Sequence, residues 1–97
     1  MTNLRKDARG RSCLIRIPGH CCADQARVVL CHVRLVGLSG AGLEVPDLLA
    51  AFGCDVCHKV VDGQVKSEFT YDERRLLLLE GVMRTQAQWI ERGVVTW

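Results

Sequence analysis

Four cysteines are spaced along the chain in a pattern that suits a zinc ion. Cys54 and Cys57 form a tight Cys-x-x-Cys pair, and Cys13 and Cys21 form a wider pair around a turn-prone Pro-Gly-His segment. Tetrahedral zinc accepts four thiolates, and such an ion ties together distant parts of a small domain. We therefore expect a structural Zn²⁺ bound by these four cysteines.

Other uses of the cysteines stay open at this point. Free buried cysteines behave as small hydrophobic residues, and Cys-x-x-Cys pairs also occur in thioredoxin-type redox sites. The redox alternative is weaker, because a glycine-rich segment precedes this pair and His58 follows it directly, whereas a redox motif lies beside a strand-helix-strand pattern. Cys22 can replace Cys21 as a ligand, and Cys31 is left without a role.

Two histidines and two aspartates are candidates for catalysis. His32 ends an apolar run directly before a glycine-rich segment, and His58 lies four residues before Asp62. On a helix this spacing puts an imidazole and a carboxylate on one face, where they can bind a divalent cation. Asp47 can orient His32 or add a ligand. Each residue also has a common structural use, as a hydrogen-bonded core histidine, a surface i,i+4 pair or a helix-start aspartate.

Basic residues are concentrated near the N-terminus, in a segment over residues 1–12 and just beyond it. These basic side chains can contact nucleic-acid phosphates. A solvent-exposed terminus is an equally good explanation of the charge cluster. The candidate nucleic-acid-binding residues are Arg5, Lys6, Arg9, Arg11, Arg16 and Arg34.

Length and composition indicate one small domain over residues 1–97. A chain of this length with 48% hydrophobic residues is long enough for one core and too short for two ordinary domains. The opening MTNLRKDARGRSCLIR lacks the apolar run of a secretory signal, and no membrane-spanning stretch follows. We expect a cytoplasmic protein without a membrane segment, whose thiols stay reduced.

Short strands, a loop and a short helix are predicted to position these residues. Apolar runs at 13–17 and 28–33 predict two strands of a hairpin-like unit. The glycines of residues 35–46 predict a loop, and residues 46–63 predict a short helix that Gly63 terminates.

A long C-terminal helix is predicted over residues 70–93. Thr70 and Glu73 match a capping box, and Gly93 provides the stop. Residues 94–97 predict a terminal strand or a partner-binding tail. An apolar stripe with steps of three and four residues predicts the face that packs on the core, namely Leu76, Leu79, Met83, Ala87 and Ile90.

The order of these features resembles the HNH nucleases, also called His-metal finger or ββα-metal nucleases. The resemblance rests on His32, the glycine loop, Asp47 and CDVCHK, in which His58 follows the second cysteine. The segments LRKDARGRSCLIRIPG, PDLLAAFGCDVCH and LEGVMRTQ are more specifically similar to the YbcO-like family of phage- and prophage-encoded nucleases. This similarity covers nearly the whole chain.

The resemblance implies an α+β fold: a small ββα-metal domain with a zinc knuckle on the four cysteines and a long C-terminal helix. It places the general base on His32 and the last metal-binding histidine on His58. Cys31 stands where many HNH proteins have a metal-binding aspartate, and Asp47 lies near the usual position of the middle asparagine. From helix geometry, Asp62 is our candidate for the missing carboxylate.

The implied function is a metal-dependent endonuclease that hydrolyses phosphodiester bonds. His32 would deprotonate water, while a divalent cation near His58 stabilises the phosphate and the leaving oxygen. Oxygen ligands suit Mg²⁺, and an imidazole ligand favours Mn²⁺, Ni²⁺ or Zn²⁺. The expected partner is nucleic acid, DNA before RNA, in phage or prophage DNA processing. Neither base recognition nor an oligomeric state is predicted.

Two alternatives belong to other functional classes. The first is a zinc-stapled nucleic-acid-binding module without cleavage activity, which is distinguished from the enzyme by whether His32 and His58 converge on one ion. The second is an accessory phage protein that acts through its long helix and its Trp97 tail. This second alternative predicts an exposed apolar stripe and dimerisation.

Overall fold

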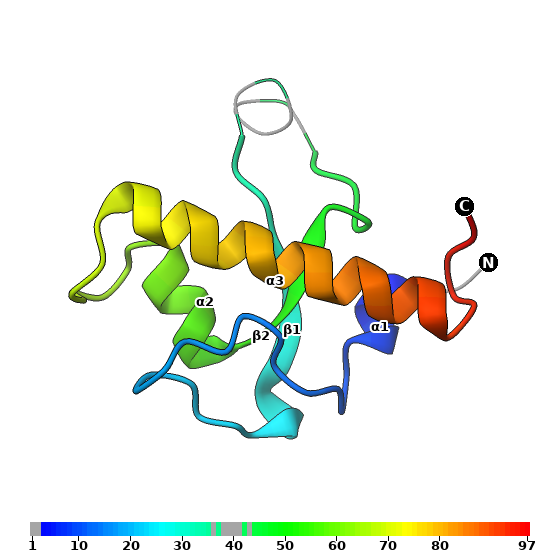
Figure 1. Cartoon of the computed structure of the whole chain (residues 1–97), viewed down its shortest axis with the longest axis horizontal. Helices are drawn as coiled ribbons and strands as arrows, with labels where there is room; N and C mark the ends of the chain where they lie inside the picture. The colour runs from blue at the N-terminus through cyan, green and yellow to red at the C-terminus, as the bar shows by residue number, and fades with distance from the viewer. Residues whose placement is uncertain (1–2, 36, 38–41, 43) are drawn as a thin grey trace.

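The computed structural model describes residues 3–35, 37, 42 and 44–97. Over these residues the chain is an α+β unit with a two-stranded sheet and a long C-terminal helix, as predicted (Figure 1). None of the described helices combines the length and the apolar character needed to cross a membrane. The elements are α1 (Leu4–Asp7), the 3-10 turn η1 (Gln25–Arg27), β1 (Val28–His32), β2 (Ala50–Cys54), α2 (Asp55–Val61) and α3 (Tyr71–Glu91).

The strands β1 and β2 pair antiparallel, in a register that runs from Val28 opposite Cys54 to His32 opposite Ala50. The strand predicted at 28–33 is confirmed, but its predicted partner at 13–17 is wrong. Those five residues form no strand, because Arg16 adopts a left-handed conformation with φ of 53° that interrupts the extended chain.

The partner strand β2 comes from the first half of the segment predicted as a helix over 46–63. Its sequence AAFGC is buried at every position, so neither its length nor its composition distinguishes a strand from a buried helical segment. The second half does form a helix, α2, which ends before Gly63, where φ is 74°. Half of the loop predicted at 35–46, namely residues 36, 38–41 and 43, lies outside the described residues, and the other half contains no helix or strand.

The outer edge of β2 is closed by two hydrogen bonds. The backbone N–H of Phe52 donates to Thr85 Oγ1 of α3 at 2.9 Å, and its carbonyl accepts from the backbone N–H of Leu14 at 2.7 Å. An unpaired strand edge is a template for wrong pairing and leaves polar groups unsatisfied. The N-terminal segment and α3 therefore complete the sheet in place of a third strand.

The helix α3 approaches β2 closely because its contact face carries small residues. A Cβ atom at Gly81 would lie 3.0 Å from the Ile15 side chain and 3.2 Å from the Ala51 Cβ, which is tighter than ordinary packing. Further along α3, the ring of Trp89 meets Phe52 edge to face, with centroids 5.5 Å apart. Figure 1 shows α3 running across the strands.

The predicted apolar stripe of α3 faces solvent, so that prediction is wrong. Exposed fractions reach 67% at Met83, and all five predicted residues are exposed, namely Leu76, Leu79, Met83, Ala87 and Ile90. The face that packs on the core instead contains Leu78, Gly81, Val82, Thr85 and Trp89. Gly81 and Thr85 on this face are small and not strongly hydrophobic. A prediction based on the spacing of large apolar residues therefore selects the wrong face of the helix.

The ends of α3 follow the sequence signals. Thr70 and Glu73 form both hydrogen bonds of the capping box, at 3.2 and 2.8 Å, which confirms the predicted start. After Gly93 the chain folds back, and the backbone N–H groups of Val94 and Val95 donate to the Trp89 carbonyl. Residues 94–97 form no strand, contrary to one of the two predictions for this segment.

Asp7 joins the first helix to the end of the last one. Its carboxylate accepts hydrogen bonds from Trp89 Nε1 at 3.0 Å, Arg92 Nη2 at 2.6 Å and Arg11 Nη2 at 3.2 Å. The hydrogen bond from Arg92 is the main reason why the pKa of Asp7 falls to about 2, while burial opposes this shift and the bonds from Trp89 and Arg11 reinforce it. We refer to these four residues as the Asp7 clamp.

Replacing Asp7 with Ala should lower the free energy of unfolding by about 2 kcal/mol at pH 7, since a shift of one pKa unit corresponds to about 1.4 kcal/mol. The folded-state pKa lies below the usual value of 3.8. This stabilisation is therefore complete above that value and is lost as the pH falls toward about 2. Urea unfolding of both proteins at pH 7 and pH 2.5 measures the difference.

Glu80→Ala is the matched control, because it removes an exposed carboxylate of α3. Its stability should stay within about 0.5 kcal/mol of the wild type. Equal stability of Asp7→Ala and the wild type at pH 7 would show that the clamp does not hold the two helices together.

Candidate functional site

The structure brings four cysteine sulfurs into one group. The Sγ atoms of Cys13, Cys21, Cys54 and Cys57 all lie within 4.8 Å of one another, and those of Cys21 and Cys54 are 4.0 Å apart. Four thiolates around a zinc ion, with bonds of about 2.3 Å, have sulfurs about 3.8 Å apart. The group therefore has the donors and the spacing to hold a tetrahedral metal ion.

Three parts of the chain deliver these sulfurs. Cys54 is both the last residue of β2 and the N-cap of α2, where its sulfur accepts the Cys57 backbone N–H at 3.4 Å. Cys57 follows within the first turn of α2. Cys21 is placed by a turn after Ile17, whose carbonyl accepts the Cys21 N–H at 2.9 Å. The Cys-x-x-Cys spacing thus coincides with a strand-to-helix junction.

The four thiols differ in acidity: the pKa values of Cys13 and Cys54 are lowered, that of Cys57 is raised, and burial raises that of Cys21. The Cys57 thiol donates to Cys13 and lowers the pKa of Cys13 to about 4 despite burial. The same pairing raises the pKa of Cys57. For Cys54, burial raises the pKa. Hydrogen bonds from the backbone N–H of Cys57 and from other donors outweigh this effect, so the pKa of Cys54 is lowered overall. Metal binding requires thiolates, so early loss of a proton favours it.

The two remaining cysteines lie outside the four-sulfur group. Cys22 belongs to a second, three-donor group with Cys54 and Asp55, in which Arg27 forms an ion pair with the Asp55 carboxylate. Cys31 is buried in β1, and desolvation, aided by the negative charge of Asp62, raises its pKa to about 12. A buried thiol of such low acidity is a poor metal ligand.

His32 lies at the end of β1 and is held by a carboxylate. Its Nε2 is 2.7 Å from Asp47 Oδ1, and the Arg5 Nε of α1 is 3.2 Å from the same oxygen. The hydrogen bond from His32, together with Arg5, keeps the pKa of Asp47 below its usual value. Asp47 is therefore positioned to orient the imidazole, which is one of the two roles predicted from the sequence and stays a prediction.

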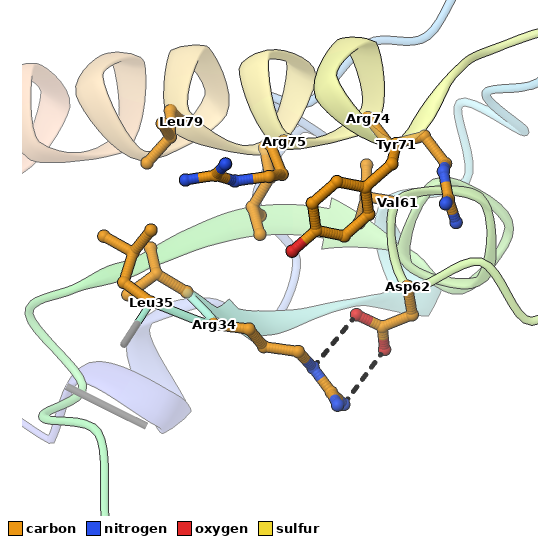
Figure 2. A pocket seen from close by; sticks show the side chains of 10 residues that line it. Arg34, Leu35, Val61, Asp62, Tyr71, Arg74, Arg75 and Leu79 are labelled. Carbon is orange, nitrogen blue, oxygen red and sulfur yellow. Dashed lines mark hydrogen bonds and ion pairs between the residues drawn. The ribbon is translucent and has the colours of Figure 1, made fainter. Parts of the chain in front are cut away.

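His58 and Asp62 also form a pair, at the end of α2. Asp62 Oδ2 lies 3.0 Å from His58 Nε2, across one helical turn. The Asp62 side chain is only 6% exposed, and Arg34 Nε lies 3.4 Å from its other oxygen. Figure 2 shows the Arg34 guanidinium facing both oxygens of this carboxylate. Arg34, predicted to contact nucleic acid, thus neutralises a candidate metal ligand.

The two histidines are attached to different carboxylates. Within the described part of the chain, the only groups of three or more potential metal ligands within 4.8 Å are the two cysteine groups, so His58 and Asp62 form a two-ligand pair. Neither ion pair of Arg5 or Arg34 follows from the sequence, because the partners lie 42 and 28 residues away.

Basic residues from the N-terminus border the His32 side of the molecule. Arg5 and Arg9 line a hollow of about 390 Å³ together with Val28, Leu30 and His32. Of the other predicted phosphate-binding residues, Arg11 is bound to Asp7, whereas Lys6 and Arg16 are exposed. The hollow therefore carries two cations beside the candidate general base.

Comparisons with known proteins agree with one another. Residues 2–94 match the family model described as "Putative nuclease YbcO". The chain is 43% identical, over 98% of both chains, to "Putative nuclease YbcO" of Escherichia coli K12 and to "Putative nuclease ybcO" of Enterobacteria phage 82.

A solved structure shares the fold. It is the "Structure of a putative bacteriophage protein from Escherichia coli str. K-12 substr. MG1655", with a TM-score of 0.78 and 36% identity. The match covers 94% of this chain and all of the other. On the family match and these relatives, the chain belongs to the YbcO nuclease family.

Proposed function

We propose that the protein is a metal-dependent endonuclease of the HNH type, with His32 as its general base. The observation that carries this proposal is the 2.7 Å hydrogen bond between His32 Nε2 and Asp47. An ionised carboxylate on Nε2 holds the ring proton there, which leaves the Nδ1 lone pair free to accept a proton from water. Catalytic histidines of hydrolases are commonly oriented by a carboxylate in this way.

The order of the elements supports the HNH assignment. His32 ends β1, β2 runs antiparallel beside it, and α2 follows β2 without a connecting loop. Strand, strand and helix thus succeed one another as the name ββα-metal describes, with His58 on the helix. The HNH family is supported by this order and by the resemblance of CDVCHK.

A divalent cation would bind at His58 and Asp62, one imidazole and one carboxylate. When bound, it would stabilise the charge on the phosphate and on the leaving oxygen. Arg34 already lies against Asp62. For the cation to bind, Arg34 has to release this carboxylate, and the freed guanidinium is then available to a phosphate.

The structural metal at the four cysteines is proposed to be zinc. Four sulfur donors favour this ion over Mg²⁺ or Ca²⁺, which take oxygen ligands. Reduced thiols fit a cytoplasmic location. The substrate is proposed to be DNA, in keeping with the phage origin of a relative.

A zinc-stapled binding module without cleavage activity is the second candidate. The two-ligand pair of His58 and Asp62, with Arg34 against it, favours this candidate because a catalytic ion usually takes more protein ligands.

His32→Ala should lose DNA cleavage by about two to four orders of magnitude, as expected when a general base is removed. The assay uses labelled duplex and single-stranded DNA with Mg²⁺, Mn²⁺, Ni²⁺ or Zn²⁺. His20→Ala is the control, since His20 is bound to Glu68 at 2.8 Å and has no proposed catalytic role. Equal activity of wild type and His32→Ala would contradict the assignment, and no cleavage by either would support the binding module.

Zinc should bind with a stoichiometry of one, through Cys21 rather than Cys22. Cys21→Ser should therefore lose the metal and melt at a lower temperature, whereas Cys22→Ser should keep both properties. Elemental analysis and thermal unfolding of the wild type and the two variants measure this. Zinc loss in Cys22→Ser alone would move the ligand to Cys22, and a metal-free wild type would leave four free thiols.

A further inference from the structure

A pocket of about 130 Å³ lies between the end of α2 and the start of α3. Its floor is apolar, with Val33, Val61 and Leu78 among the lining side chains. Its rim carries Tyr71, the only tyrosine of the chain, and three arginines from two parts of the molecule (Figure 2). None of Arg74, Arg75 and Tyr71 is among the residues predicted from the sequence to bind nucleic acid or metal.

Tyr71 presents an exposed aromatic ring at the rim of the pocket. It is the first residue of α3 and is 63% exposed. The guanidinium carbons of Arg74 and Arg75 lie 5.8 and 5.6 Å from its ring centroid, so the ring is fixed by two cation–π contacts. In Figure 2 its hydroxyl points toward the space between Arg34 and Arg75.

The rim has more positive charge than its one carboxylate neutralises. Asp62 forms an ion pair with Arg34. Arg75 has no hydrogen bond or ion pair to any described residue, and Arg74 Nε is buried without a hydrogen-bond partner. The Arg75 guanidinium is therefore left to attract an anion, and its planar shape matches the geometry of phosphate.

We propose that this pocket binds one unpaired nucleotide of a nucleic-acid strand. The base lies against Tyr71 and the apolar floor, and the phosphate lies at Arg75 next to Arg34. A base within a duplex is stacked on both faces and paired along its edge, so only an unpaired base can enter the pocket. The inference rests on the proposed function, because it defines the substrate class of that site as single-stranded or locally unpaired nucleic acid.

Both halves of the pocket are needed for this ligand. A simple anion would make no use of the apolar floor, and an apolar peptide would leave the guanidinium groups without a partner. An aromatic platform with adjacent cations is the recurring way in which proteins bind single strands. Asp62 belongs to the same pocket, so the bound phosphate lies beside the proposed cation site.

The test measures binding in the absence of cleavage. Fluorescence anisotropy compares a labelled twelve-nucleotide oligo-dT with a hairpin duplex, using His32→Ala as the background so that the strands stay intact. Single strands should bind more tightly than the duplex. Tyr71→Ala should weaken single-strand binding on the order of tenfold. Arg75→Ala should lower the salt dependence of log K for single strands by about 0.7.

Matched controls remove a similar group elsewhere. Trp97→Ala removes an aromatic side chain that is 99% exposed, and Lys59→Ala removes an exposed charge from α2. Both should bind oligo-dT as the background protein does. Amide NMR spectra should show shifts from oligo-dT at residues 33–35, 61–62 and 71–79, and the same spectra report whether each variant is folded.

The outcomes separate this inference from the nuclease proposal. If Tyr71→Ala and Arg75→Ala are folded but bind single strands weakly, the proposed nucleotide pocket is supported. This holds even if the wild type cleaves no DNA. Equal binding by these variants and the controls, or tighter binding of the duplex, overturns it even where His32-dependent cleavage is observed.

Discussion

One residue, Cys54, fixes the relation between the sheet, the second helix and the cysteine group. It closes the register of the sheet opposite Val28, and its sulfur caps α2 through the Cys57 N–H. The same sulfur lies 4.0 Å from that of Cys21, which the N-terminal segment supplies. Because strand, helix and sulfur group share this residue, the direction of α2 is set by the strand. The position of His58, one turn along α2, is therefore also set by Cys54.

The two histidine sites repeat one arrangement of charges. In each, an imidazole and a guanidinium share a carboxylate, Asp47 with Arg5 and Asp62 with Arg34. In both sites the arginine limits the rotation of the carboxylate. The two sites differ in burial, because the Asp62 side chain is 6% exposed and that of Asp47 is 33% exposed. The imidazoles show the opposite order, because the His58 side chain is 36% exposed and that of His32 is 26% exposed.

Local signals in the sequence predicted the parts of the fold that depend on neighbouring residues. The capping box at Thr70, the stop at Gly93 and the strand at 28–33 follow from side chains within a few positions. The cysteine group also followed, since zinc ligands have characteristic spacings. Errors arose where a distant contact decides the structure. AAFGC is a strand because β1 pairs with it, and α3 turns its small residues inward because Ile15 and Ala51 lie so close.

The Asp7 clamp and the contacts of Ile15 have a consequence for the growing chain. Asp7 and Ile15, near the start of the sequence, contact Gly81, Trp89 and Arg92, which are synthesised much later. Asp7 and Ile15 therefore lack these partners until α3 has been synthesised, and Ile15 stays exposed on that side in the meantime. Docking of the N-terminal segment on the sheet and on α3 is therefore completed only after α3 has been synthesised.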